Sequence, residues 1–269
     1  MFEWIKRHEL TAYFLLAFLT TWVLISPLAL SAPISPHWHF LGALGPISAA
    51  FIVTAVATGR PGISEFLGRL LNWQVGLVWL LTSIFSPFLL FLLAVLIARF
   101  TGNSWANFSK LASGEYATFA WIGGSLLSAV AYGIGEEAGW RGFALPRLQQ
   151  KHTALMATFL LSVFWALWHA PMFLYRFEFG IGQVIGFFVG MFAGAIWLTF
   201  LYNSTDGSTL MVVFWHMSWN IVNIIGLVVS IEVVAYMSTM VIVAAILIVM
   251  IGKPARLSRR HKHTLEVVS

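Results

Sequence analysis

Few ionisable side chains fall inside the long apolar segments of this chain, and those few are the candidates for chemistry. Two glutamates end one apolar run, and single histidines lie in two later runs, the second with an asparagine: Glu136, Glu137, His169, His216 and Asn220. An ionisable group inside a membrane is costly, so each is a functional hypothesis if these runs cross one. A carboxylate can take a proton from water, while imidazole and carboxamide N–H groups can stabilise an oxyanion. Attack of water on a carbonyl is one chemistry that this set permits.

The same side chains also permit a metal site. Glu136, His169 and His216 form a plausible zinc ligand set with an open fourth position. Their spacing does not separate zinc chemistry from metal-free water activation, so the cofactor is either none or zinc. Taken singly, a buried histidine or ion pair is commonly structural. Taken together on three apolar segments, these residues favour a catalytic or binding site.

Helical spacing indicates which residues near the glutamate pair share a face. Adjacent residues lie about 100° apart on an α-helix, so Glu136 and Glu137 cannot point to the same place. Glu137 lies four residues before Arg141, the favoured order for an ion pair, which leaves Glu136 to point into the bundle. Gly135 and Gly139 form a pair of small residues that would let another helix approach closely.

The same spacing pairs residues in the two later segments. Trp165 and His169 are four residues apart, so an indole shares a helix face with that imidazole. His216 and Asn220 are also four residues apart and share a face. Pro171 should loosen the helix just after His169 because proline cannot donate a helical hydrogen bond.

The elements that must position these side chains are membrane-spanning helices. Of the 269 residues, 59% are hydrophobic and 9% are charged, whereas a soluble domain carries roughly 25% charged residues. A crossing helix needs about 20 apolar residues. Such runs occupy residues 10–32, 38–58, 75–99, 117–137, 153–177, 181–202, 208–229 and 231–251. We therefore predict an all-α integral membrane protein, a bundle of about eight transmembrane helices that forms a single membrane domain over residues 1–269.

The distribution of basic residues predicts the orientation of the bundle. An even number of spans puts both termini on one side, and with that side inside, the outer segments hold only Arg99, Lys110 and Arg176 of the 15 lysines and arginines. Both termini, with a basic tail at 252–269 that contacts lipid headgroups, are therefore expected in the cytoplasm. The lack of a targeting segment suggests a prokaryotic cytoplasmic membrane. No basic face suited to nucleic acid is present.

Depth in the membrane constrains the connection between the fourth and fifth runs. If these runs turned at Pro146, Glu136 and His169 would differ in depth by roughly 20 Å at 1.5 Å per residue. We therefore expect residues 138–151 to form an amphipathic element of their own at the cytoplasmic face, with a fifth span that tilts or starts late. A separation of more than about 10 Å between Glu136 and His169 would contradict a shared site.

Three segments resemble the motifs of one family. They read GEEAGWRG at 135–142, FWALWHAP at 164–171 and HMSWN at 216–220. In this order they resemble the CAAX prenyl protease and bacteriocin-processing (CPBP) family of intramembrane proteases. The resemblance covers about 117–229, the expected catalytic core. One position departs from the family, because Trp165 stands where phenylalanine is usual, and this changes the expected size of the pocket.

The resemblance implies an enzyme, an intramembrane endopeptidase that cleaves near the C-terminus of a membrane-associated protein or peptide, with or without a prenyl group. By motif position, Glu136 resembles the water-activating glutamate and His169 a second contact to that water. His216 and Asn220 resemble the pair that stabilises the oxyanion. The supporting positions are held by Glu137, Arg141 and Trp165. The family has been described both as metalloproteases and as metal-free, glutamate-dependent enzymes, so the resemblance leaves the cofactor open.

Two other classes of function remain as alternatives. A non-catalytic member of the family would act in bacteriocin self-immunity or as a membrane scaffold. A proton-coupled transporter would use Glu136 as a proton relay. Zinc proteases with a His-Glu-x-x-His motif and thiol proteases are excluded, because that motif and cysteine are both absent from the sequence. Replacing Glu136 by glutamine separates the classes, because a protease must then lose its activity and a scaffold need not.

Overall fold

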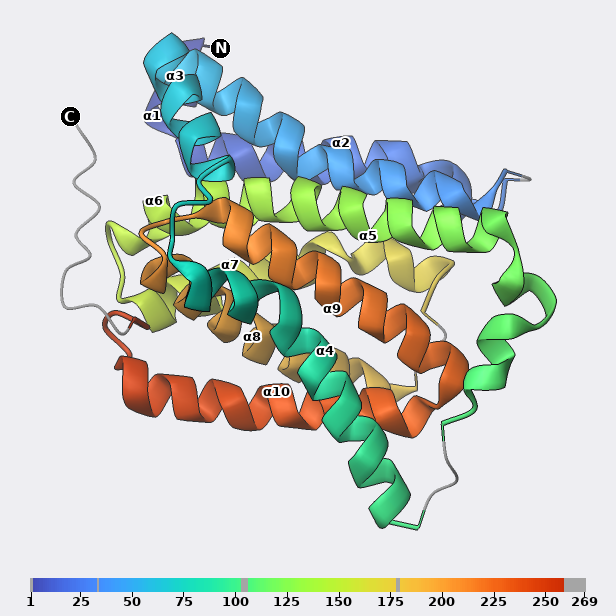
Figure 1. The fold of residues 1–269 in the computed structure, drawn as a ribbon. Coiled ribbons are helices and arrows are strands. Elements are labelled where there is room, and N and C mark those ends of the chain that lie inside the picture. Colours follow the sequence, from blue (N-terminus) through green and yellow to red (C-terminus); the bar gives the residue numbers. More distant parts are fainter. Residues whose placement is uncertain (1, 33, 103–105, 178–179, 259–269) are drawn as a thin grey trace.

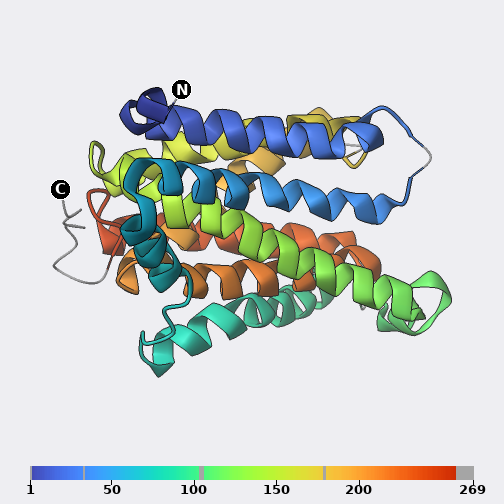
Figure 2. The same cartoon turned by 90° about the horizontal axis from the view of Figure 1, so that it is seen from above.

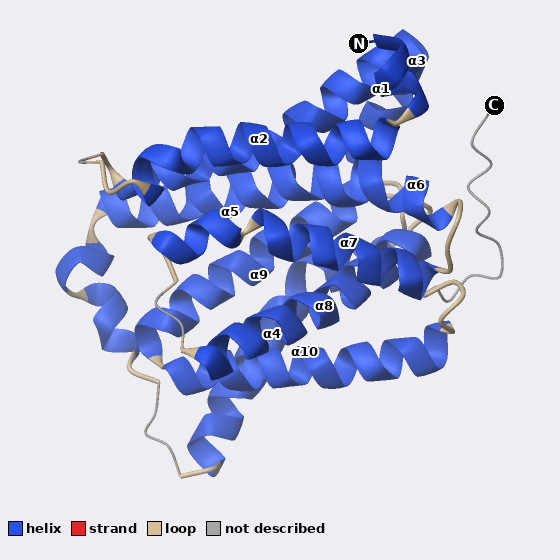
Figure 3. Ribbon diagram, turned by 180° about the vertical axis from the view of Figure 1, so that it is seen from behind, coloured by secondary structure: helices blue, strands red, loops and turns tan. Residues whose placement is uncertain are grey.

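The computed structural model of the chain describes residues 2–32, 34–102, 106–177 and 180–258 (Figure 1). Within these ranges the chain forms helices joined by loops and no strand, so the predicted all-α class is confirmed (Figure 3). The long helices are α2 (Glu9–Ala29), α3 (Leu44–Leu70), α4 (Leu77–Phe100), α5 (Phe119–Gly139), α7 (Ala154–Trp168), α8 (Ile181–Ser204), α9 (Thr209–Val229) and α10 (Ile231–Gly252). The short elements include α1 (Phe2–Arg7), α6 (Leu145–Gln149) and the 3-10 turns η1 (Pro36–Ala43) and η5 (Ala170–Leu174).

Seven helical stretches of the described chain are long and apolar enough to cross a membrane. They contain α2, α3, α4, α7, α8, α9 and α10, and they make the protein an integral membrane protein. The eighth predicted span corresponds to α5, which is as long as α2 but carries the glutamate pair and several glycines that lower its hydropathy. α5 is therefore the polar helix of the bundle, and it lies against α3 and α9 rather than at the edge (Figure 2).

Small residues on α5 allow its close packing inside the bundle. A Cβ atom at Gly135 would lie 2.2 Å from the carbonyl oxygen of Ala43, and one at Gly139 would lie 2.5 Å from Pro46. Both distances are far below van der Waals contact, so only glycine fits at these positions. The close helix approach predicted for this pair is confirmed, and it places Glu136 in the protein interior.

The helical path does not turn at Pro146, which agrees with the argument from depth against a plain turn there. A π-helical turn, η4 (Trp140–Ala144), joins α5 directly to α6. Pro146 offers no N–H to the carbonyl of Gly142, and Arg69 supplies a donor instead, with 3.3 Å between its Nη2 and that oxygen. Residues 138–151 thus include an element of their own, but the expectation of an amphipathic surface element was wrong, because residues 139–146 are buried.

This longer helical path resolves the difference in depth between the site residues. The chain turns at residues 150–153 and α7 begins at Ala154, capped by the Thr153 hydroxyl. Glu136 lies 14 residues before Gln150, and His169 lies 16 residues after Thr153. At 1.5 Å per residue, their depths along the bundle differ by only about 3 Å. α7 ends at Trp168 and a 3-10 turn follows, as Pro171 predicted.

The described ends of the chain lie at the same end of the bundle. α1 and residues 253–258, which we call the C-terminal strap, both lie there (Figures 1 and 2). The strap folds back from α10, and the N–H groups of Ala154 and Leu155 donate to the carbonyls of Ala255 and Pro254 over 3.1 and 3.0 Å. This arrangement agrees with an even number of spans. Most of the predicted basic tail at 252–269 lies outside the described residues, and its cytoplasmic orientation stays a prediction.

Candidate active site

Glu136 is fixed in the interior by two tryptophans from different elements. The residue is 3% exposed, and Oε2 of its carboxylate accepts hydrogen bonds from Nε1 of Trp140, at 3.3 Å, and from Nε1 of Trp165. Trp140 lies in the π-helical turn, one turn beyond Glu136, and Trp165 lies on α7. Among the described residues no hydrogen bond reaches Oε1 of Glu136. One oxygen thus orients the carboxylate and the other is available to a ligand or water.

His169 follows α7 directly and has a defined tautomer. Its Nδ1 lies 2.8 Å from the carbonyl oxygen of Trp165, and because a carbonyl only accepts, Nδ1 carries the hydrogen. In the neutral ring Nε2 then keeps its lone pair and acts as an acceptor. The ring centroids of Trp165 and His169 are 6.0 Å apart, so a single indole contacts both His169 and Glu136. The expected shared site is therefore consistent with the fold.

The predicted Glu137–Arg141 pair is confirmed, and it includes a third member. Oε1 of Glu137 accepts from Nη1 of Arg141 at 2.9 Å and from Nδ1 of His216 at 2.7 Å. The side chains of Glu137 and Arg141 are fully buried, and that of His216 is 8% exposed. The Arg141 guanidinium also lies over the Trp165 ring, with 4.6 Å from Cζ to the ring centroid. Glu137 therefore holds His216 in place from a helix 79 residues away in the sequence.

His216 and Asn220 present their free polar atoms on one face of α9. Because Nδ1 of His216 is bonded to Glu137, its Nε2 is the atom left for a ligand. The ring of His216 stands edge-on to that of Trp165, with 6.0 Å between centroids. Asn220 lies one turn further along α9 and is half-buried, and its side chain makes no hydrogen bond within the described ranges. The predicted i,i+4 pairing is thus seen in the helix, while the catalytic roles of both residues stay predictions.

Aromatic residues that the sequence did not single out form a wall beside His169. The ring of Phe187, on α8, lies 5.4 Å from that of His169 between centroids. Phe173 and Phe177 lie 5.5 and 5.3 Å from Phe187. Only tertiary packing brings α8 to the end of α7, so no local pattern could have found these residues. Trp140 is different, because it follows Glu136 by four residues and the helical-spacing argument applied to it as well.

The zinc alternative for Glu136, His169 and His216 stays a prediction. Within the described part of the chain, no three His, Asp or Glu side chains gather in a way that could hold a metal ion. Oε2 of Glu136 accepts from two indole N–H groups, and Nδ1 of His216 is bonded to Glu137. Hydrogen-bond donors around a carboxylate stabilise its charge without a cation. We therefore derive no step that uses zinc.

Comparison with known proteins places the site in a recognised family region. The family model described as type II CAAX prenyl endopeptidase Rce1-like matches residues 117–222. The predicted resemblance to this family is confirmed over the matched residues. The matched range contains every predicted site residue. The CAAX prenyl protease 2 of Methanococcus maripaludis is 25% identical over 231 residues, which cover 80% of this chain and 84% of that protein. Both comparisons support an intramembrane endopeptidase.

Proposed function

We propose that this chain is an intramembrane endopeptidase that hydrolyses a peptide bond near the C-terminus of a membrane-associated protein or lipidated peptide. One observation carries the proposal: Trp165 contacts the Glu136 carboxylate, the His169 ring and the His216 ring at once. A base, a water acceptor and an oxyanion donor thus converge from three helices. Such convergence of polar groups in an apolar bundle is the arrangement that hydrolysis requires.

The first step is attack by water. Oε1 of Glu136 takes one proton from a water molecule whose other hydrogen bonds to Nε2 of His169. The oxygen of that water forms a bond to the carbonyl carbon of the scissile peptide. The two indoles on Oε2 hold the carboxylate still while this happens. Holding the base and the water in place reduces the entropy lost on reaching the transition state.

The oxyanion formed in that step is stabilised from α9. The negative charge of Glu137 allows His216 to carry protons on both ring nitrogens, so that Nε2–H donates to the oxyanion. The side-chain amide of Asn220 provides a second N–H. When the intermediate collapses, the carbon–nitrogen bond breaks and Glu136 returns its proton to the leaving amine. Glu136 ends each cycle as a carboxylate, and the atoms balance without a cofactor.

The surroundings of the site agree with a lipid-attached substrate. The relative from Methanococcus is named as a prenyl protease, and the aromatic wall of Phe173, Phe177 and Phe187 offers an apolar surface beside His169. Burial of a hydrocarbon chain there would anchor the substrate at about 0.8 kcal/mol per CH₂ group. We propose that the substrate enters from the cytoplasmic side of a prokaryotic membrane, where the peptide part of such a molecule lies.

Cleavage of a fluorogenic farnesylated CAAX peptide by the purified protein in detergent tests this function. Glu136→Gln keeps the shape of the side chain but removes the base, and it should lower kcat by at least about 100-fold. Glu232→Gln is the matched control, because Glu232 is exposed and bonds only to Ser230 in the described chain. Equal cleavage by wild type and Glu136→Gln would refute the proposal. Loss of cleavage in Glu232→Gln would show instead that the assay reports protein stability.

A further inference from the structure

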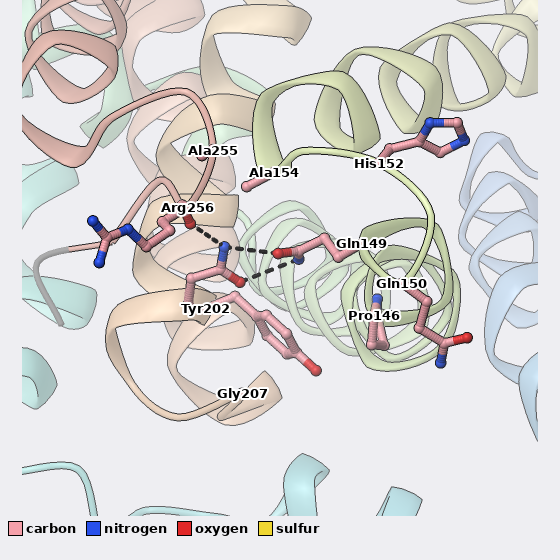
Figure 4. A pocket seen from close by; sticks show the side chains of 10 residues that line it. Pro146, Gln149, Gln150, His152, Ala154, Tyr202, Gly207, Ala255 and Arg256 are labelled. Atoms are coloured by element: carbon pink, nitrogen blue, oxygen red, sulfur yellow. Dashed lines mark hydrogen bonds between the residues drawn. The ribbon is translucent and has the colours of Figure 1, made fainter. Parts of the chain in front are cut away.

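A second polar cavity lies at the end of the bundle where the C-terminal strap packs. Its volume is about 270 Å³, and it is enclosed by α6, the start of α7, the end of α8 and the strap (Figure 4). Glu136, His169 and His216 do not line it. Three apolar stretches end at its walls, at Ala154, Ser204 and Gly252. The cavity therefore lies at the level where apolar helices give way to lipid headgroups.

Two hydrogen-bond donors beside this cavity are buried without a partner. The hydroxyl of Tyr202, a residue that lines the cavity and is 0% exposed, has no hydrogen-bond partner among the described residues. The same holds for Nε of Arg69. The two side chains meet at Gly207, where a Cβ atom would lie 3.3 Å from the Tyr202 hydroxyl and 3.7 Å from Cδ of Arg69. Buried donors without partners are rare in native proteins, and a ligand is one explanation.

Side-chain hydrogen bonds join the wall of the cavity, and no acidic residue lines it. The carboxamides of Gln149 and Asn203 bond to each other twice, at 3.2 and 3.0 Å, and Asn203 also donates to the carbonyl of Arg256 at 2.7 Å (Figure 4). His152 and Arg256 are the ionisable basic residues of the lining, and no Asp or Glu lines it. A lining with donors and basic groups but no carboxylate favours an anionic ligand.

We propose that this cavity binds a phosphate group, with the Tyr202 hydroxyl as a donor and Arg256, whose guanidinium points away from Tyr202 in Figure 4, as a longer-range positive charge. The position at the ends of three spans favours a phospholipid headgroup as the source of the phosphate. A bound phosphate would tie α6, which continues from the helix of Glu136, to α8 and to the strap at the start of α7. It would thus stabilise both elements that lead to the active site.

Thermal unfolding in a phosphate-free maltoside detergent tests this site without any assay of activity. The purified protein is titrated with short-chain phosphatidylglycerol, with glycerol 3-phosphate, and with a diacylglycerol of the same chains. At 100-fold excess over Kd, the phospholipid should raise Tm by roughly 5 °C or more, and the diacylglycerol should not. An equal rise with glycerol 3-phosphate would support the phosphate site with a soluble source. No rise with either phosphate compound would refute the proposal.

Two variants test whether the rise in Tm with phospholipid comes from binding in this cavity. Tyr202→Phe removes an unpartnered buried hydroxyl, so without ligand its Tm should equal or exceed that of wild type, while the rise with phospholipid should fall by at least half. Arg256→Gln should weaken the rise in the same way. Tyr236→Phe, whose hydroxyl bonds Thr101 far from the cavity, is the control and should keep the full rise. A full rise in both Tyr202→Phe and Arg256→Gln would place the phosphate elsewhere and overturn the inference.

Discussion

Oε1 of Glu137 accepts hydrogen bonds from both Arg141 and His216, so the variant Glu137→Gln tests both contacts at once. Glu137→Gln keeps the size of the side chain but removes the negative charge that faces Arg141 at 2.9 Å and His216 at 2.7 Å. Both Glu137 and Arg141 are fully buried, so the Arg141 charge would be left uncompensated. Breaking a buried pair in this way costs about 3–5 kcal/mol. For a chain of this size that is a fall in Tm of roughly 6–20 °C.

A partly exposed pair of the same residue types provides the matched control. Glu65 and Arg69 have the same residue types and the same i,i+4 spacing, with 2.5 Å between Oε1 and Nη1, but the Glu65 side chain is 64% exposed. Glu65→Gln should therefore change stability by less than about 1 kcal/mol. Differential scanning fluorimetry of both variants in the same detergent measures the contrast. Equal Tm values for Glu137→Gln and Glu65→Gln would refute the assignment of a buried charge network.

The double variant Glu137→Gln/Arg141→Met separates stability from catalysis. Without either charge no ion is left unpaired, so most of the lost Tm should return. Activity should stay about 100-fold below wild type, because a neutral His216 that donates from Nδ1 has no hydrogen on Nε2 for the oxyanion. Peptide cleavage measured beside Tm checks this. Recovery of both properties together would show that Glu137 serves the fold and not the orientation and charge of His216.

Three further predictions follow from the geometry. Gly135→Ala should lower Tm by several degrees because its Cβ would meet Ala43 at 2.2 Å, whereas Gly123→Ala, with nothing within 4 Å, should not. Trp165→Phe removes one of the two donors to Glu136 and should lower kcat by about tenfold, the value of a hydrogen bond to a charged group. A chelator should leave kcat/KM unchanged in the peptide assay, and a loss that added zinc restores would contradict the metal-free proposal.

Local patterns predicted the parts of the site that lie within one helix. The ion pair of Glu137 with Arg141 and the break at Pro171 depend only on spacing and on proline chemistry, so the sequence was sufficient. The spans followed from apolar runs in the same way. The contact between Glu137 and His216 could not be predicted, because it depends on how α5 and α9 are rotated against each other.

The error over residues 138–151 has a specific physical cause. A plain turn at Pro146 would have put Glu136 and His169 at different depths, so we expected a separate surface element over these residues. Pro146 instead lies in the first turn of α6, where a missing N–H costs little, and Arg69 provides a donor to the carbonyl left free. That donor is 73 residues away in the sequence. A tertiary contact therefore allows the helix to continue through Pro146. Neither the composition nor the local sequence indicates that contact.

The C-terminal strap has a consequence for biosynthesis. The helix that leads to His169 begins with two N–H groups whose acceptors, in Pro254 and Ala255, lie about 100 residues later in the chain. A ribosome adds roughly 5–20 residues per second. Several seconds therefore pass between the synthesis of this helix and the synthesis of the two carbonyl groups that accept its first hydrogen bonds. During that interval the nascent chain has its glutamate and its first histidine but lacks a finished scaffold around them. The start of α7 therefore reaches its final hydrogen bonding only after the strap has been synthesised.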